Sequence, residues 1–326
     1  YTQLDKKLWN ILNVSVGFRG ESFKMNDEEV VAQPIFRSGL NLKLAEASFV
    51  RYSYGQGYRF PTITEKYIYS DIGGLTIFPN PILQPETSWN SEIGFKQGFK
   101  INNFVGFIDL AAFWQEYKNT IEFTYGVWDK GKDMLGDDSL SVGFKYLNTG
   151  TTRVKGFEVS MSGQGKISKD LKVDILFGYT YVLPQAIHPA EVFAIDSNPQ
   201  PMSYNFTSTD TTKDILKYRF QHIAKIDLQL TYKIISIGGS WRYYSFIQNI
   251  DQVFYMFEPV MKSGIKEYRE EHNDGTHIFD ARLGVDVTKK FKVAFVVNNV
   301  MNLSYSLRPL KIESPRTFAL RLSFSF

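Results

Sequence analysis

The sequence contains no cysteine among its 326 residues. The chain therefore forms no disulfide, offers no thiolate nucleophile and holds no cysteine metal site. It also has no run of about 18 apolar residues, the length that a transmembrane helix needs. The opening stretch, YTQLDKKLWN, lacks the methionine and the apolar region of a signal peptide, and it is compatible with a start inside a longer chain. A net charge of +3 is too small to indicate nucleic acid as a partner.

Sequence motifs of catalysis are missing as well. No G-x-S-x-G, H-E-x-x-H or P-loop pattern occurs, and carboxylates paired for acid–base work cannot be picked out. Of the four histidines, His272 and His277 lie five apart in an acidic segment, where a solvated loop is favoured over a metal site. We predict no catalytic residue, no metal and no cofactor. An outer-membrane lipase or protease is the weakest alternative, because no histidine has a persuasive serine partner.

Aromatic residues are abundant at 16% of the chain, with 27 Phe and 19 Tyr. Apolar and polar residues alternate with period two, most clearly over residues 216–233, where even positions except His222 are apolar and odd positions except Ile223 are polar. This pattern predicts about twelve strands. They lie near 8–20, 33–44, 47–57, 87–99, 103–125, 152–163, 170–182, 215–232, 234–246, 276–288, 291–302 and 314–326. The strand near 103–125 loses its alternation around residues 116–120, which indicates a bulge. No helix of note is expected.

The predicted connections alternate between short and long. The short ones are 44–47, 100–102, 165–169, 232–234 and 289–290; the long ones are 22–32, 58–86, 126–151, 183–214, 248–275 and 304–313. An up-and-down antiparallel sheet that crosses a slab, with one plain rim and one rim of large loops, has this pattern. A soluble β-sandwich has no reason to place every long loop on one side.

The polar faces of the predicted strands carry many charges. Those charges are Arg51, Lys225, Asp227, Arg242, Asp280, Arg282, Asp286 and Arg321. Charges of both signs suit a wet or plugged interior, while Tyr and Trp at strand ends suit a membrane boundary. We therefore predict an all-β, antiparallel, up-and-down transmembrane β-barrel, because only a closed barrel satisfies the backbone of strands within lipid.

Four motifs follow one another along the chain. They are RYSYGQGYRFPTITEKY, then NPILQPETSWNSEIGF, then YLNTGTTRVKGFEVS, and finally the hairpin of FVVNNVMNLSYS with SPRTFALRLSFSF. Together they resemble the signature of TonB-dependent outer-membrane receptors. The matching residues are Arg59, Pro61, Thr62, Glu65, Asn80, Pro81, Pro85, Glu86, Glu92, Gly156, Glu158, Arg316 and Phe326. We expect those in the first motif to fix the roots of a long external loop rather than to touch a ligand, since proline sets the backbone angle φ there.

The resemblance implies a barrel of about 22 strands preceded by a plug domain. This chain has about twelve strands and no plug, so residues 1–326 are expected to be the C-terminal portion of the barrel, with Tyr1 at a periplasmic turn. By the resemblance, the whole protein lies in the bacterial outer membrane and imports a scarce nutrient: a metal chelate, vitamin, glycan or peptide. The implied partners are the TonB–ExbB–ExbD complex acting through the missing plug, the rest of the barrel, and outer-membrane lipids. A surface-exposed lipoprotein is a further candidate.

Aromatic side chains and one histidine in the long loops are the candidate ligand contacts. They are Tyr67, Tyr69, Phe78, Trp128, His188, Phe193, Tyr204 and Tyr255. Packing of the loops against one another is the competing role for each of them. The alternative to a receptor is a complete small barrel of about twelve strands, acting as a passive pore or autotransporter translocator. It requires residues 1–20 to pair with residues 314–326.

Overall fold

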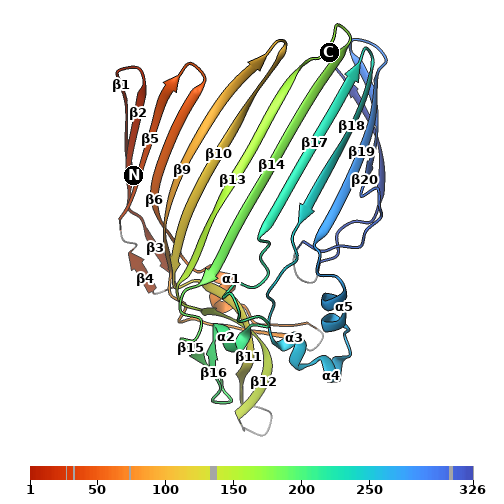
Figure 1. Cartoon of the computed structure of the whole chain (residues 1–326). Coiled ribbons are helices and arrows are strands. Elements are labelled where there is room, and N and C mark those ends of the chain that lie inside the picture. Colours follow the sequence, from red (N-terminus) through yellow and green to blue (C-terminus); the bar gives the residue numbers. More distant parts are fainter. Residues whose placement is uncertain (27, 32–33, 73–74, 133–137, 308–310, 326) are drawn as a thin grey trace.

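The computed structural model describes residues 1–326 except 27, 32–33, 73–74, 133–137, 308–310 and 326. Phe326, the last residue of the family signature, thus lies outside the described residues. Thirteen strands form one antiparallel sheet whose neighbours follow chain order (Figure 1). The strands are β1 (Thr2–Leu8), β2 (Leu12–Arg19), β5 (Ile35–Ala45), β6 (Ser48–Arg59), β9 (Glu86–Ile101), β10 (Phe104–Lys118), β13 (Thr152–Lys166), β14 (Leu171–Ala186), β17 (His222–Tyr232), β18 (Ile235–Tyr244), β19 (Thr276–Asp286), β20 (Phe291–Asn298) and β21 (Thr317–Phe324). We call this sheet the wall.

Tight turns occupy one rim of the wall and long segments occupy the other (Figure 1). The turns use left-handed residues: Trp9 and Asn10 have φ of 48° and 57°, and Asn102 and Lys233 have φ of 53° and 51°. Asparagine tolerates this region better than most residues, which is why it recurs there. The alternation of short and long connections predicted from the sequence is confirmed.

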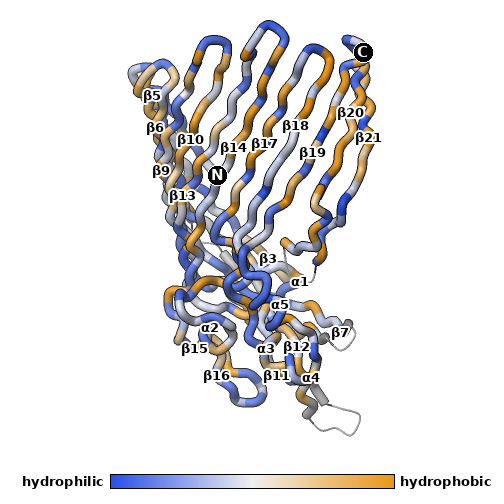
Figure 2. The backbone as a smooth tube through the Cα atoms, turned by 45° about the vertical axis from the view of Figure 1, so that its right-hand side comes forward, coloured by the Kyte–Doolittle hydropathy of each residue, from blue (hydrophilic) through white to orange (hydrophobic). Residues whose placement is uncertain are grey.

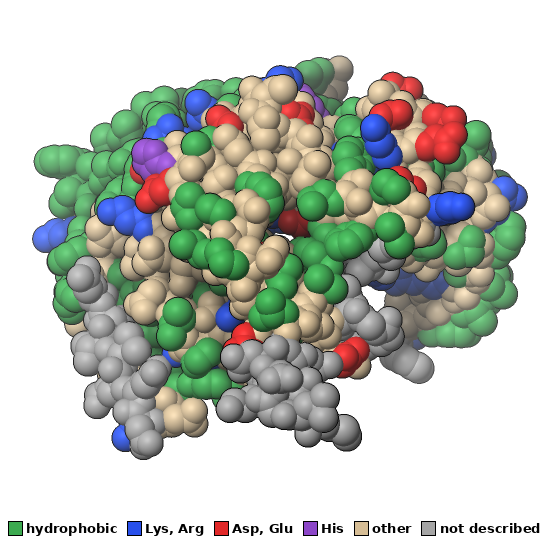
Figure 3. Space-filling view, turned by 90° about the horizontal axis from the view of Figure 1, so that it is seen from below, with side chains coloured by type: hydrophobic (Ala, Val, Ile, Leu, Met, Phe, Trp, Pro, Cys, Tyr) green, Lys and Arg blue, Asp and Glu red, His purple; other side chains and the backbone are tan. Residues whose placement is uncertain are grey.

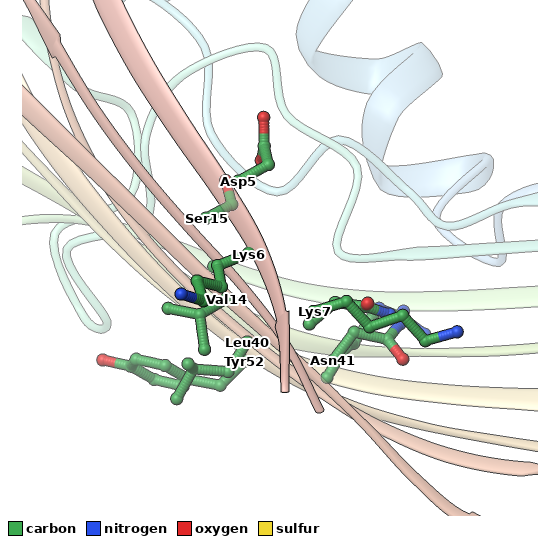
Figure 4. A pocket seen from close by; sticks show the side chains of 11 residues that line it. Asp5, Lys6, Lys7, Val14, Ser15, Leu40, Asn41 and Tyr52 are labelled. Carbon is green, nitrogen blue, oxygen red and sulfur yellow. The ribbon is translucent and has the colours of Figure 1, made fainter. Parts of the chain in front are cut away.

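The wall presents its apolar face to the surroundings. Large apolar side chains on it are strongly exposed, such as Ile237 at 61% and Leu320 at 68%. Figure 2 shows hydrophobic and hydrophilic residues alternating along each strand. In a hollow of about 520 Å³ at the β1 edge, Val14, Leu40 and Tyr52 project to one side of the sheet (Figure 4). Among the described residues no second sheet covers the apolar face, which excludes the soluble sandwich.

Two arginine latches cross the polar face. Arg51 on β6 lies over Gly94 of β9 and reaches Asp109 of β10, with 2.6 Å between Nη1 and Oδ1. On the same face, nearer the β21 edge of the wall, the guanidinium of Arg282 lies over Gly238 of β18 in the same way. Its Nη2 is 2.6 Å from Oδ1 of Asp227 on β17. In both latches a glycine opposite the arginine leaves room for the guanidinium to bind two strands away.

Three details of the strand prediction were wrong. The wall has thirteen strands, because β1 precedes the first predicted strand; Tyr1 is therefore one strand away from the short-turn rim, not at it. The predicted bulge is instead a break: β10 ends at Lys118, Asn119 takes φ of 55°, and the chain leaves the wall. Residues 215–221 do not extend β17, which begins at His222, since Leu216 and Lys217 are buried among loops.

The edges of the wall are open. Within the described part of the chain, β1 pairs only with β2 and β21 only with β20. The alternative of a complete small barrel requires these two edges to pair with each other. The structure does not support that alternative.

The long segments fold into a crown beyond one rim of the wall (Figure 1). We use crown for residues 60–85, 119–151, 187–221 and 245–275. Its main sheet has the order β11 (Ile121–Lys132), β12 (Asp138–Asn148), β8 (Leu75–Phe78) and β7 (Ser70–Ile72), and β15 (Val192–Ile195) pairs with β16 (Pro201–Ser203). A separate hairpin of β3 (Ser22–Met25) and β4 (Glu28–Val31) follows β2.

Five short helices belong to the crown, although the sequence pattern indicated none. They are α1 (Ile63–Tyr67), α2 (Tyr204–Thr207), α3 (Val253–Met256), α4 (Glu258–Met261) and α5 (Ile265–Glu271). None of the helices in the described residues has the length and apolarity needed to span a membrane.

Gly156 supplies a test of the packing in the wall. A Cβ added there would lie 2.0 Å from the carbonyl oxygen of Tyr181 and 2.8 Å from the ring of Phe113. We expect Gly156→Val to destabilise the folded barrel by about 2 kcal/mol, because overpacking forces backbone shifts. The measurement is the temperature to which a sample must be heated before its compact, fast-migrating form disappears from an SDS gel that is run cold.

The matched control is Gly178→Val on the adjacent strand and the same face, where an added Cβ meets no atom within 4 Å. Equal losses in the two variants would show that the tight contact is not responsible.

Candidate functional site: the loop crown

The root of the first crown loop is an ion-pair cluster around Arg59. Its Nε lies 2.5 Å from Oε2 of Glu86, and its Nη1 donates to both oxygens of Glu65 at 2.9 Å. Thr62 caps α1: its hydroxyl accepts from the N–H of Glu65, whose carboxylate accepts from the N–H of Thr62. Burial by itself would raise the pKa of the Glu65 carboxyl. The hydrogen bonds from Arg59 and Thr62 outweigh this effect, and the pKa of Glu65 is lowered. Pro61 is buried directly before the cap.

The second root joins this loop to the hairpin of β11 and β12. The side chain of Asn80 donates to the carbonyl of Tyr146 at 2.7 Å. Asn148 exchanges hydrogen bonds with the backbone of Gln84 at 2.9 and 3.0 Å. Oε1 of Glu86 accepts the N–H of Ile121 at 2.6 Å, so one carboxylate joins both loops. The geometry agrees with a positioning role for these signature residues, which stays a prediction.

A buried charge cluster lies next to this root. Lys217 is 4% exposed and its Nζ is 2.6 Å from Oδ1 of Asp251, which is 3% exposed. The same Nζ is 4.0 Å from Oε2 of Glu122. Lys217, Asp251 and Glu122 come from three different crown segments. We call these three residues the crown belt. A buried cation with two carboxylates holds loops together at places distant in the sequence.

Tyrosine hydroxyls complete the environment of the crown belt. Tyr218 donates to Oδ2 of Asp251 at 2.6 Å, and the hydroxyl of Tyr204 accepts the N–H of Lys217 at 2.5 Å. Burial and the neighbouring carboxylates raise the pKa of Tyr204. Burial also raises the pKa of Glu122, although Lys217 opposes the shift. The crown belt is therefore a site with little access to water, in which one lysine ammonium faces the carboxyl groups of Asp251 and Glu122.

Three predicted ligand contacts are instead buried in the packing of the crown. Phe78 and Trp128 are 2% and 5% exposed and form a cluster with Leu147 and Met202. Tyr204, at 3%, packs against the start of the segment that leads into β17. The indole N–H of the tryptophan donates to a backbone carbonyl at 3.1 Å, which satisfies its polar atom. These three side chains pack the loops against one another, and their contact with a ligand stays a prediction.

The other predicted contacts are accessible to differing degrees and are not brought together. Tyr67, Tyr69 and His188 are exposed. Phe193 packs beside the buried cluster, and the hydroxyl of Tyr255 accepts from Nε of Arg269 at 3.2 Å. Seen from the crown side, hydrophobic side chains surround a narrow hollow near the centre (Figure 3). Across the described residues no group of His, Asp and Glu has the geometry of a metal site.

The remaining signature residues lie elsewhere. Glu92 pairs with Arg51 on the wall at 3.2 Å. Glu158 is exposed on the polar face of β13, and within the described part of the chain its side chain makes no ion pair or hydrogen bond. The backbone N–H of Arg316 donates to the side chain of Asn302 at 2.9 Å, before β21 begins. Pro81 is exposed and Pro85 is half-buried at the loop root.

One aromatic surface was missed in the sequence. Phe123 and Phe144 stack with centroids 4.6 Å apart, and Tyr125, Tyr146 and Phe257 pack beside them at 4.8 to 5.8 Å. We call these five the aromatic face of the hairpin. All but one of its rings are half-buried. The signal was present as aromatic residues at alternate positions, but the break at residue 119 hid that β11 and β12 are strands.

Comparisons with known proteins agree with this architecture. Residues 1–300 match the family model described as "TonB dependent receptor-like, beta-barrel". Two curated relatives come from Haemophilus influenzae. Hemoglobin and hemoglobin-haptoglobin-binding protein A is 29% identical over 133 residues, which are 39% of this chain and 12% of the relative. Probable hemoglobin and hemoglobin-haptoglobin-binding protein 4 is 27% identical over 114 residues, 34% of this chain and 11% of the relative.

Two solved structures have the same fold at low sequence identity to this chain. The hemophore receptor HasR of Serratia marcescens, in complex with its hemophore HasA and heme, superposes with a TM-score of 0.63 at 16% identity. That match covers 99% of this chain and 50% of HasR. The copper transporter OprC gives 0.61 at 14% identity, covering 99% and 46%. The chain thus spans half or less of the length of these receptors.

Lys217 provides a test of the crown belt. We expect Lys217→Met to loosen the three belt loops by about 3 kcal/mol, because buried Asp251 and half-buried Glu122 lose their cation. Hydrogen exchange of amides near residues 122, 217 and 251 measures the loss. Lys213→Met, an exposed lysine in the same segment, is the control. Unchanged exchange in Lys217→Met would contradict a role for the belt.

The raised pKa of Glu122 makes crown stability depend on pH. The folded crown binds this proton more tightly than the unfolded chain does. The contribution is thus present at acid pH and is lost as the pH rises through the raised pKa. We expect Glu122→Gln to slow proteolysis of the crown at neutral pH, with a difference that fades towards pH 4.5, the ordinary value. Glu158→Gln on the wall is the control, and a benefit of Glu122→Gln that grows at low pH would refute the assignment.

Proposed function

Because the chain belongs to the β-barrel family of TonB-dependent receptors, we propose that it is the C-terminal portion of such a barrel. The whole receptor then imports a scarce nutrient across the bacterial outer membrane, where this family resides. This chain supplies wall and crown, with the crown facing the outside. The family consists of transporters and receptors, and the protein hydrolyses nothing in this proposal.

The crown belt is the observation that carries the proposal. Loops that served only to connect strands would need no buried cation between three of them, since desolvating such charges is costly. A ligand receptor benefits from loops held in one arrangement, because fixed loops lose less conformational entropy on binding. The signature cluster at Arg59 fixes the fourth loop beside the belt.

The polar face of the wall supports a plug as the internal partner. Glu158 and Lys225 are exposed on this face and form no ion pair in the described structure. Free charges of both signs on an inner wall suit contacts with a polar domain that fills the barrel. In this proposal the TonB–ExbB–ExbD complex rearranges that plug, and lipids cover the apolar face. A surface lipoprotein above the crown is a further partner to test.

Among nutrients, a haem-bearing ligand is the one we favour. Both curated relatives are named for binding haemoglobin. The aromatic face offers stacked rings within the crown, and such rings suit a flat macrocycle. Burial raises the pKa of Tyr125 and of Tyr146 above the ordinary value of a tyrosine. Other iron chelates share this chemistry and are the competing class.

Uptake in cells tests the proposal. We expect the full-length receptor to support growth on haemoglobin as the only iron source, and we expect deletion of TonB to abolish that growth but not binding. Tyr125→Ala should weaken binding about tenfold, while Phe206→Ala, an exposed aromatic of α2, should not change it. Growth that persists without TonB would contradict active import. Growth on ferric chelates but not on haemoglobin would leave import intact and reject haem.

A further inference from the structure

A basic patch lies on the apolar face of the wall, at the crown end of β10 and β13. We call Lys118, Arg153 and Lys155, with Trp114 and Glu116, the rim patch. Trp114 and Glu116 lie four and six residues after exposed Leu110 on β10, so all three side chains are on the same, lipid-facing side of the strand. In register, Glu116 is opposite Arg153 and Trp114 is opposite Lys155. The patch is therefore a continuous surface across two paired strands.

Contacts within the rim patch fix its aromatic centre. The guanidinium of Arg153 lies 4.9 Å from the ring of Trp114, and Nζ of Lys155 lies 5.7 Å from it. Oε1 of Glu116 accepts from Arg153 at 2.8 Å and from the indole N–H at 3.2 Å. Trp89 of β9 is opposite Glu116 in register. Two tryptophans at one level of the wall are typical of the membrane–water boundary.

Charge in the rim patch is not balanced. One carboxylate, Glu116, stands against three cations, and it is already bound by Arg153. In the described structure neither Lys118 nor Lys155 has an ion-pair partner. Two net positive charges thus face outward beside hydrocarbon, where a cation is costly unless an anion accompanies it. An anionic group at the lipid boundary would neutralise these two lysines.

We propose that the rim patch binds the phosphorylated headgroup of an outer-leaflet glycolipid. The inference rests on the orientation in the proposed function, which puts the crown end of the wall in the outer leaflet. Lysine and arginine at this depth meet lipid phosphates directly, and Trp114 packs against the adjoining sugar or acyl carbon. Inorganic phosphate offers the same charge but lacks the apolar part that would contact the tryptophan.

Binding of lipid A to the purified full-length receptor in neutral detergent tests this. We expect tighter binding of bis-phosphorylated lipid A than of its dephosphorylated form or of phosphatidylglycerol. Lys118→Gln and Lys155→Gln should each weaken binding about fivefold, and the double variant about 25-fold. Neither lysine has an ion-pair partner to lose, so both variants should fold. The matched control is Lys233→Gln with Lys290→Gln, at the short-turn rim.

Three results would overturn the rim-patch assignment. These are equal affinity in the double variant and its control, equal affinity for dephosphorylated lipid A, and competition by inorganic phosphate at the concentration of the lipid. The measurement contains no nutrient and no TonB. Failed nutrient uptake with intact lipid selectivity would therefore count against the proposed function alone, and loss of selectivity with intact uptake would count against the rim patch alone.

Discussion

Hydrogen bonding of the strand backbone is the constraint on which the rest of the protein depends. Hydrocarbon offers no partner to an N–H or a carbonyl, so every strand of the wall must pair with its neighbours along its full length. Continuous pairing then fixes which side chains face lipid and which face inward. It also forces the chain to turn tightly at one rim, and leaves the other rim free to carry large structures. Because the wall strands satisfy the backbone hydrogen bonds within lipid, the crown segments outside the lipid can adopt other structures.

The crown obeys a different rule. Its segments are too short and too polar to form a large apolar core, and among the described residues its main buried cluster consists of Phe78, Trp128, Leu147 and Met202. Order comes instead from specific polar contacts between segments, above all Lys217 with its carboxylates and Glu86 with the two loop roots. Such contacts are directional, so they select one arrangement of the loops. The same contacts are costly to desolvate, which makes the crown more responsive to charge and pH than the wall.

Period-two alternation predicted most of the wall, because the lipid and the interior demand opposite side chains at successive positions. The same rule failed where a strand leaves the wall: past Asn119 neither face meets lipid, so the alternation no longer reports on the sheet. Short helices such as α1 were not predicted, because a helix of about one turn is too short to show a 3.6-residue repeat of apolar positions. Candidate contacts were the least predictable part. The sequence does not show whether an aromatic residue in a loop is buried, like Trp128, or exposed, like Tyr69. Its exposure depends on how the neighbouring loops fold.

The arginine latches have a consequence for whatever occupies the interior of the barrel. An extended arginine would project far from the sheet and present a bare charge. Held flat over Gly94, Arg51 lies low and shares its charge with Asp109 and Glu92. Arg282 does the same over Gly238. At these two places the guanidinium lies close to the sheet and is paired with carboxylates, so a body moving along the inner surface would meet no outstretched, unpaired cation there.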